Sequence, residues 1–179
     1  MQARGDRFES DILHQFIMNQ ELIVKQLHQW MKDFIEQPNE KLDGWAPCPY
    51  ARQARINKKI QILFNDPVHF DQAINQASDM LQDKEAVIVV FDHTLISHED
   101  LTMFVRDKNL ELNKENIVIL RDHPNDPEYI NDVKMNFDLY GLLVIQQLSE
   151  LKKASQFLQS KGYYNSWDAN VHQAMTRWR

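Results

Sequence analysis

The sequence predicts an α/β fold, in which a small, partly parallel sheet of three to four strands packs with helices and a long N-terminal helix precedes the sheet. Residues 86–91 form a continuous run of apolar side chains, most of them β-branched, which is typical of a strand buried on both faces. Residues 117–120 repeat this pattern. Segments in which apolar residues recur every three or four positions alternate with these two runs, and that alternation favours helices layered on a sheet.

The composition excludes several classes of protein. The chain has 179 residues, which is the size of one domain. Its 20 basic and 26 acidic residues give a net charge of −6, so general binding to a nucleic-acid backbone is not expected. The longest apolar run is too short to span a bilayer, and no signal peptide is visible, so we expect a cytoplasmic protein with no membrane partner. The single cysteine, Cys48, excludes an internal disulfide and a multi-cysteine metal site.

We expect one domain with three parts, which are an N-terminal helix over residues 7–37, an α/β core over residues 40–160 and a C-terminal helix over residues 163–179. Apolar residues at helical spacing predict the first helix, and Pro38 ends it. The apolar stripe of this helix packs on the sheet in the simplest arrangement. A pair of such helices in a homodimer is the alternative.

Within the core, residues 58–64 alternate weakly between polar and apolar and are expected to form the first strand. Residues 65–67 then supply a cap and a first-turn proline for a helix that runs to about residue 82. Ser97 followed by Asp100 resembles a capping box and is expected to begin the next helix.

The last third of the core is predicted to be a polar loop followed by a strong helix. The loop covers residues 122–135, and a fourth strand is expected near residues 132–136. Residues 138–160 show helical spacing, and Gly162 ends that helix. The apolar residues with this spacing are Leu142, Ile145, Leu148, Leu151 and Phe157.

Cys48 stands between two prolines, which stiffen the loop and fix the direction of the thiol. A thiol near a helix N-terminus and close to Arg52 and Arg55 is shifted toward thiolate, the form that acts as nucleophile or metal ligand. The alternative is a structural cysteine packed under Trp45 and Tyr50.

Two of the predicted strands end in the same dipeptide. Asp92 and His93 follow the first apolar run, and Asp122 and His123 follow the second. If the strands are parallel, the two dipeptides share the edge of the sheet where α/β folds place ligands. Two histidines flanked by carboxylates suit an acid–base pair or a transition-metal site, with iron or zinc as the candidate ion. Polar residues that only cap the strand exits are the alternative.

The loop after the last apolar run is rich in polar side chains, which indicates the wall of a site as much as a solvated loop. Its candidates for binding a substrate are Arg121, Lys134 and Asn136. With Arg52, these residues would hold a small anionic ligand, because a guanidinium matches a carboxylate or phosphate with two hydrogen bonds.

The box Cys48-Pro49-Tyr50-Ala51, together with His123-Pro124 after a buried strand, resembles an uncharacterised bacterial protein family. Members of that family look alike in a Cys-Pro-Phe-Ala box, a later His-Pro and an asparagine shortly before a leucine-rich helix, which here corresponds to Asn136. The similarity covers roughly residues 40–170. The resemblance implies a small α/β domain in which Cys48, His123 and Asn136 merit attention, and it implies no activity.

Two functions follow from these features. The first is a small cytoplasmic enzyme acting on an anionic small molecule, with Cys48 as nucleophile or metal ligand and His123 as the acid–base group. Cys48 precedes the first strand whereas His123 follows a later one, so this pair needs an antiparallel first strand or a long loop excursion. A metal site of Asp92, His93, Asp122 and His123 does not have this difficulty. The second function is a non-enzymatic protein-binding or adaptor domain that uses the acidic surface, the long first helix and the C-terminal segment for contacts.

Overall fold

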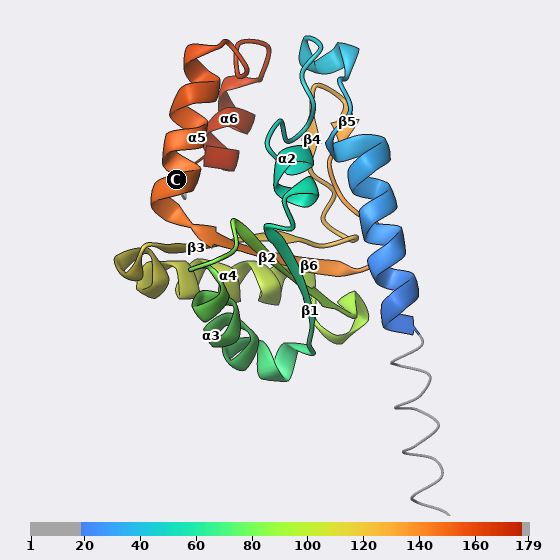
Figure 1. The fold of residues 1–179 in the computed structure, drawn as a ribbon, viewed down its shortest axis with the longest axis vertical. Helices are drawn as coiled ribbons and strands as arrows, with labels where there is room; N and C mark the ends of the chain where they lie inside the picture. The colour runs from blue at the N-terminus through green and yellow to red at the C-terminus, as the bar shows by residue number, and fades with distance from the viewer. Residues whose placement is uncertain (1–18, 177–179) are drawn as a thin grey trace, which may run out of the picture.

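The computed structural model describes residues 19–176, except for the side chains of residues 174 and 175 (Figure 1). The expected helix begins at residue 7, and its part over residues 7–18 lies outside the described residues. The strands are β1 (Ile60–Phe64), β2 (Ala86–Phe91), β3 (Ile117–Asp122), β4 (Tyr129–Ile130), β5 (Val133–Lys134) and β6 (Gly141–Gln147). The helices are an N-terminal helix over residues 19–35 that ends in the π-helical turn η1 (Met31–Ile35), α2 (Ala51–Ile56), α3 (Phe70–Met80), α4 (His98–Leu112), α5 (Leu148–Ser160) and α6 (Ala169–Thr176). Short 3₁₀ turns are η2 (Glu40–Leu42), η3 (Pro67–His69), η4 (His93–Leu95) and η5 (Asn113–Glu115).

The predicted α/β class is confirmed by a four-stranded sheet in the order β1-β2-β6-β3. β1 pairs with β2 in parallel, and β6 is antiparallel to both β2 and β3. As a result β1, β2 and β3 run in one direction, and they end at Phe64, Phe91 and Asp122 along a shared side of the sheet that we call the carboxyl edge. β6 begins at this edge with Gly141 and returns across the sheet.

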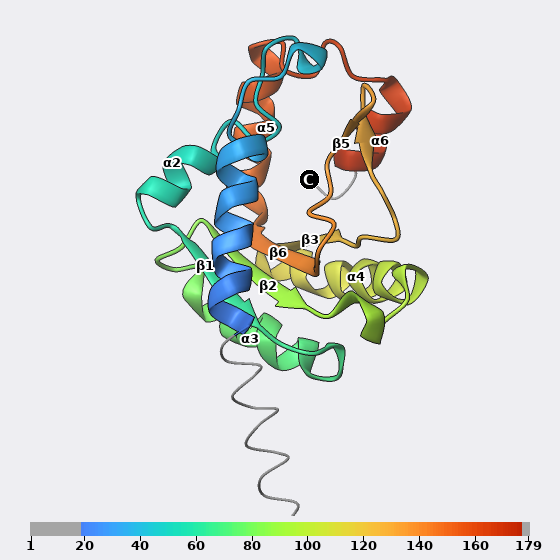
Figure 2. The ribbon, with the colours of Figure 1, turned by 90° about the vertical axis from the view of Figure 1, so that its right-hand side faces the viewer.

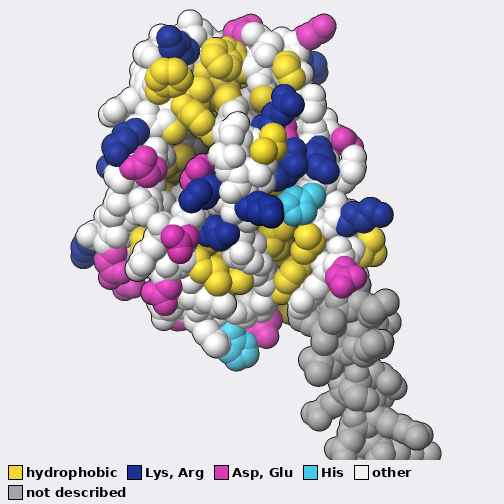
Figure 3. All heavy atoms as spheres, in the orientation of Figure 1, with side chains coloured by type: hydrophobic (Ala, Val, Ile, Leu, Met, Phe, Trp, Pro, Cys, Tyr) yellow, Lys and Arg dark blue, Asp and Glu magenta, His cyan; other side chains and the backbone are white. Residues whose placement is uncertain are grey.

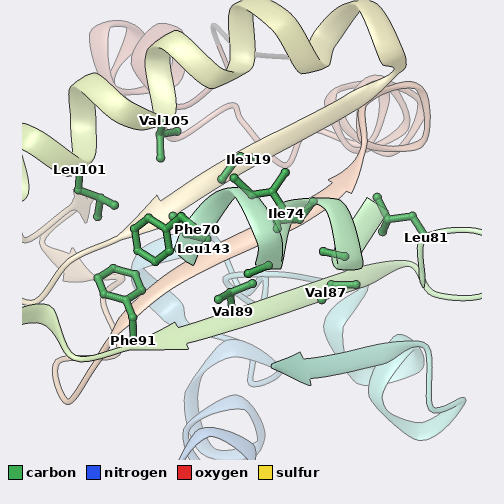
Figure 4. Packing of buried hydrophobic residues seen from close by; sticks show 13 residues of the cluster. Phe70, Ile74, Leu81, Val87, Val89, Phe91, Leu101, Val105, Ile119 and Leu143 are labelled. Carbon is green, nitrogen blue, oxygen red and sulfur yellow. The ribbon is translucent and has the colours of Figure 1, made fainter. Parts of the chain in front are cut away.

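Two layers of helices bury the two faces of the sheet (Figures 1 and 2). Helices α3 and α4 cover one face, where Phe70, Leu101 and Val105 pack against the side chains of β2 and β3 (Figure 4). The rings of Phe70 and Phe91 meet edge to face with centroids 5.0 Å apart. The N-terminal helix covers the opposite face through Ile23 and Leu27, as its apolar stripe predicts. Within residues 19–176, no helix is long and apolar enough to cross a membrane.

The predicted helix over residues 138–160 is wrong in its first part, because residues 141–147 form the strand β6. Leu142, Ile145 and Leu148 are three residues apart, which imitates a helical stripe, whereas the run from residue 141 to 145 is short, apolar and buried on both faces of a sheet. The expected fourth strand near residues 132–136 is β5. It pairs with β4 in a separate two-stranded sheet and does not join the main one.

A side chain of α4 covers the outer edge of β3, where no further strand from residues 19–176 pairs. Asn109 is fully buried, donates from its Nδ2 to the carbonyl of Ile119 at 2.9 Å and accepts from the Ile119 N–H at 2.8 Å. This amide satisfies both backbone groups that an additional strand would otherwise take. The edge of the sheet is therefore closed at Ile119.

Gly141 is required where β6 begins beside β2. A Cβ at this position would overlap the ring of Phe91, which is held in the core against Phe70. We therefore expect Gly141→Ala to lower the free energy of unfolding by about 1–3 kcal/mol, measured by urea denaturation. Gly141→Ala should cost less in a Phe91→Leu background, because that background lacks the obstructing ring. An equal cost of Gly141→Ala in the wild-type and Phe91→Leu backgrounds would contradict this explanation.

Candidate functional site

His123 lies just beyond β3 at the carboxyl edge, and it is almost completely buried, with 1% of its surface exposed. Its Nε2–H donates to the carbonyl oxygens of Ile96, at 3.1 Å, and His93, at 3.2 Å. Its Nδ1 accepts from the N–H of Asn125 at 3.1 Å. Both ring nitrogens are therefore occupied by backbone groups, and the imidazole ties the loop after β2 to the loop after β3.

Asp122 and Asn136 join the end of β3 to the segment that leads into β6. Asp122 accepts from the Nδ2 of Asn136 at 2.6 Å and from the N–H of Phe137 at 2.8 Å. Asn136 in turn accepts from the N–H of Glu128 and donates to the carbonyls of His123 and Asp126. Burial raises the pKa of Asp122, and the hydrogen bonds from Phe137 and Asn136 act in the opposite direction. This network closes the loop on itself.

The polar residues that follow β2 also contact groups close to them in the sequence or at the same edge of the sheet. Asp92 caps η4 by accepting from the N–H and Oγ1 of Thr94, and these bonds hold the pKa of Asp92 below its usual value. The rings of His93 and His98 lie against that of His123, with centroids 5.7 and 6.1 Å away. These contacts favour the interpretation that the polar residues at this edge only cap the strand exits.

The predicted iron or zinc site is not supported. Within residues 19–176, no group of three or more His, Cys, Asp or Glu side chains is arranged to hold a metal ion. The physical reason is the bonding just described, because the carboxylates already accept from N–H and hydroxyl groups and His123 has no ring nitrogen to give to an ion. The residues predicted to form this site are Asp92, His93, Asp122 and His123.

Cys48 lies in a different part of the molecule, between the N-terminal helix and the C-terminal aromatic residues. Cys48 is exposed, and its N–H donates to the carbonyl of Ile35 at 3.0 Å. The carbonyl of the preceding Pro47 accepts from the hydroxyl of Tyr163. The loop continues through α2 into the amino end of β1, and β1 is parallel to β2. β1 is therefore not the antiparallel first strand that would bring Cys48 to His123. A catalytic role for Cys48 stays a prediction.

The four residues predicted to bind an anionic substrate do not share a partner. Arg121 forms an ion pair with Asp126 at 2.7 Å, and Lys134 forms one with Asp138 at 2.7 Å. Asn136 belongs to the buried network, and Arg52 lies exposed on α2. The charges of Arg121 and Lys134 are thus balanced within their own loop.

A basic depression that the sequence analysis did not identify lies between the N-terminal helix and α2. It has a volume of about 450 Å³ and is lined by Lys25, His28, Gln29, Lys32 and Arg55; we call it the basic groove. Lysine and arginine side chains gather beside a histidine on the face shown in Figure 3. Lys25, His28 and Lys32 share one side of the helix because they are three and four residues apart. Neither lysine forms an ion pair with an acidic residue in the described part of the chain.

One wall of the basic groove is fixed by a bidentate ion pair. Arg55 donates from Nε and Nη2 to the two carboxylate oxygens of Glu36, at 2.6 and 2.8 Å. The Glu36 side chain is only 2% exposed, and its hydrogen bond raises the pKa of Arg55. A planar guanidinium held this way positions α2 against the end of the N-terminal helix.

Comparison of the chain with models of protein families, with curated proteins and with solved structures finds no significant match. The resemblance of the Cys48 box and of His123-Pro124 to an uncharacterised bacterial family therefore stays a prediction.

The buried network makes a prediction for pH. A carboxyl group whose pKa is higher in the folded than in the unfolded chain adds stability below the unfolded value, about 3.9 for Asp, and that stability is lost as pH rises through the folded value. We therefore expect the wild type to lose free energy of unfolding relative to Asp122→Asn as pH rises from about 4 toward neutrality. Urea denaturation of both proteins over this range measures the difference. A wild type that gains on the variant as pH rises would show that the hydrogen bonds to the carboxylate outweigh burial.

Proposed function

We propose that this chain is a non-enzymatic binding domain that takes an acidic segment of a partner protein in the basic groove. The observation that carries the proposal is the placement of Lys25, His28 and Lys32 on one helix side, facing Arg55 of α2, with no acidic partner for either lysine among the described residues. Charges left uncompensated on a folded surface favour a ligand of opposite charge. We place this binding function in the cytoplasm, as the sequence leads us to expect.

The chemistry of the groove favours a peptide with several carboxylates. Lysine ammonium groups are flexible point charges, which suit carboxylates at varied positions better than the fixed fork of a guanidinium does. Arg55 already gives two of its donors to Glu36, so it supports the groove mainly through its charge. The depression is open at the surface, which suits a segment laid across it.

The net charge of the whole chain restricts the partner further. At −6, the chain outside the groove carries an excess of acidic residues. A long polyanion such as nucleic acid extends past the groove and meets that excess, whereas a short acidic segment meets only the groove. The geometry also supports the enzyme hypothesis less well, because His123, Asp122 and Asn136 are committed to one another and to backbone groups.

Selection from a random peptide library tests this function. We expect the full-length protein, immobilised at physiological salt, to enrich peptides rich in Asp and Glu. Lys25→Ser together with Lys32→Ser should abolish that enrichment, because it removes two charges from the groove.

The matched control is Lys114→Ser together with Lys152→Ser, which removes the same charge from exposed positions on η5 and α5. This control should enrich acidic peptides as the wild type does. Selection of peptides with no acidic bias, or equal loss in both double variants, would contradict a binding site in the groove.

A further inference from the structure

His28 occupies the middle of the basic groove, and cations surround it. Lys25 and Lys32 flank it on the same helix, and Arg55 faces it from α2. Burial lowers the pKa of His28, the positive charges of Arg55 and Lys32 lower it further, and Glu36 acts in the opposite direction. A lowered pKa favours the neutral imidazole when the groove is empty.

We infer that the basic groove takes up a proton on His28 when an acidic segment binds, so that the protein binds its partner more tightly as pH falls. The inference rests on the proposed function, because it needs an anion in the groove. The geometry that carries it is the shared helix side, since a carboxylate held between Lys25 and Lys32 lies beside the imidazole of the residue between them.

The physical reason is that a bound anion offsets the positive charges that lower the pKa of the imidazole. A bound carboxylate compensates the charges of Lys32 and Arg55 and also accepts a hydrogen bond from the protonated ring, whereas the cost of burial remains. Among the described residues, the charged groups that face His28 are Lys25 and Lys32 from its own helix, Glu36 just after that helix and Arg55 from α2. Glu36 does not supply this compensation itself, because Arg55 engages both of its oxygens.

The thermodynamic linkage between proton binding and peptide binding determines how strongly the affinity depends on pH. Each unit by which binding raises the pKa of His28 makes the complex about tenfold tighter at low pH than at high pH. Among the described residues His28 is the one histidine that lines the groove, so the groove takes up at most one proton there for each bound segment. The increase therefore stops once the pH falls below the pKa of His28 in the empty groove.

Titration of the histidine ring protons by NMR tests the inference on the full-length protein. The probe is N-acetylated hexaglutamate amide, whose carboxylates stay ionised between pH 6 and 8. We expect saturating probe to raise the pKa of His28 by at least about half a unit, which corresponds to a threefold gain in affinity. The spectrum of His28→Gln identifies the resonance. NaCl at the ionic strength of the probe is the control and should not reproduce the rise.

The outcomes separate the inference from the proposed function. If hexaglutamate shifts the amides of residues 25–32 to saturation and the pKa of His28 stays unchanged or falls, the groove binds an anion and the inference is wrong. If the probe shifts no groove resonance at any pH, the proposed function itself fails. An equal rise of the His28 pKa when NaCl replaces the probe at the same ionic strength would reflect general ionic screening and would also overturn the inference.

Discussion

The antiparallel strand β6 between β2 and β3 is the constraint on which the rest of the structure depends. Because β6 starts at the carboxyl edge, the chain that leaves β3 must turn back at that same edge, and it does so through the β4–β5 hairpin. Its return is fixed by the bonds from Asn136 and Phe137 to Asp122. The start of β6 also needs Gly141, since the Phe91 ring occupies the place of a side chain.

The path of the chain into β6 determines which polar residues at the carboxyl edge have hydrogen-bonding groups left for a ligand. The strand exits of an α/β sheet are open to ligands when helices follow the strands, but here the returning chain takes up the hydrogen-bonding capacity of Asp122 and His123. The opposite end of β6 leads into α5, and the residues after α5 reach the Cys48 loop through Tyr163. Cys48 thus precedes the amino end of β1, whereas His123 follows the carboxyl end of β3. Lys25 and Lys32, which have no ion-pair partner among the described residues, lie instead where α2 meets the N-terminal helix.

The sequence predicts most of the strands and little of the site. Residues 86–91 form the predicted strand because six consecutive apolar residues cannot be placed on a half-exposed helix, and Ser97 caps α4 through the N–H of Asp100 as its pattern predicts. β6 is not predicted, because its spacing satisfies a helix as well as a strand until the pairing partners are known. Asn109 gives no signal, since its role requires the edge position of β3. The basic groove combines spacing within one helix, which the sequence contains, with Arg55 from α2, which only the fold brings near.

The most direct test of this account is the footprint of an acidic peptide, chosen by library selection, on the amide resonances of the full-length protein. If the carboxyl edge is structural and the basic groove is functional, the peptide shifts residues 25–32 and 51–56 and leaves residues 92–98 and 121–137 unchanged. Shifts centred on His93, His123 and Asn136, with the groove unaffected, would contradict the account and return the site to the strand exits.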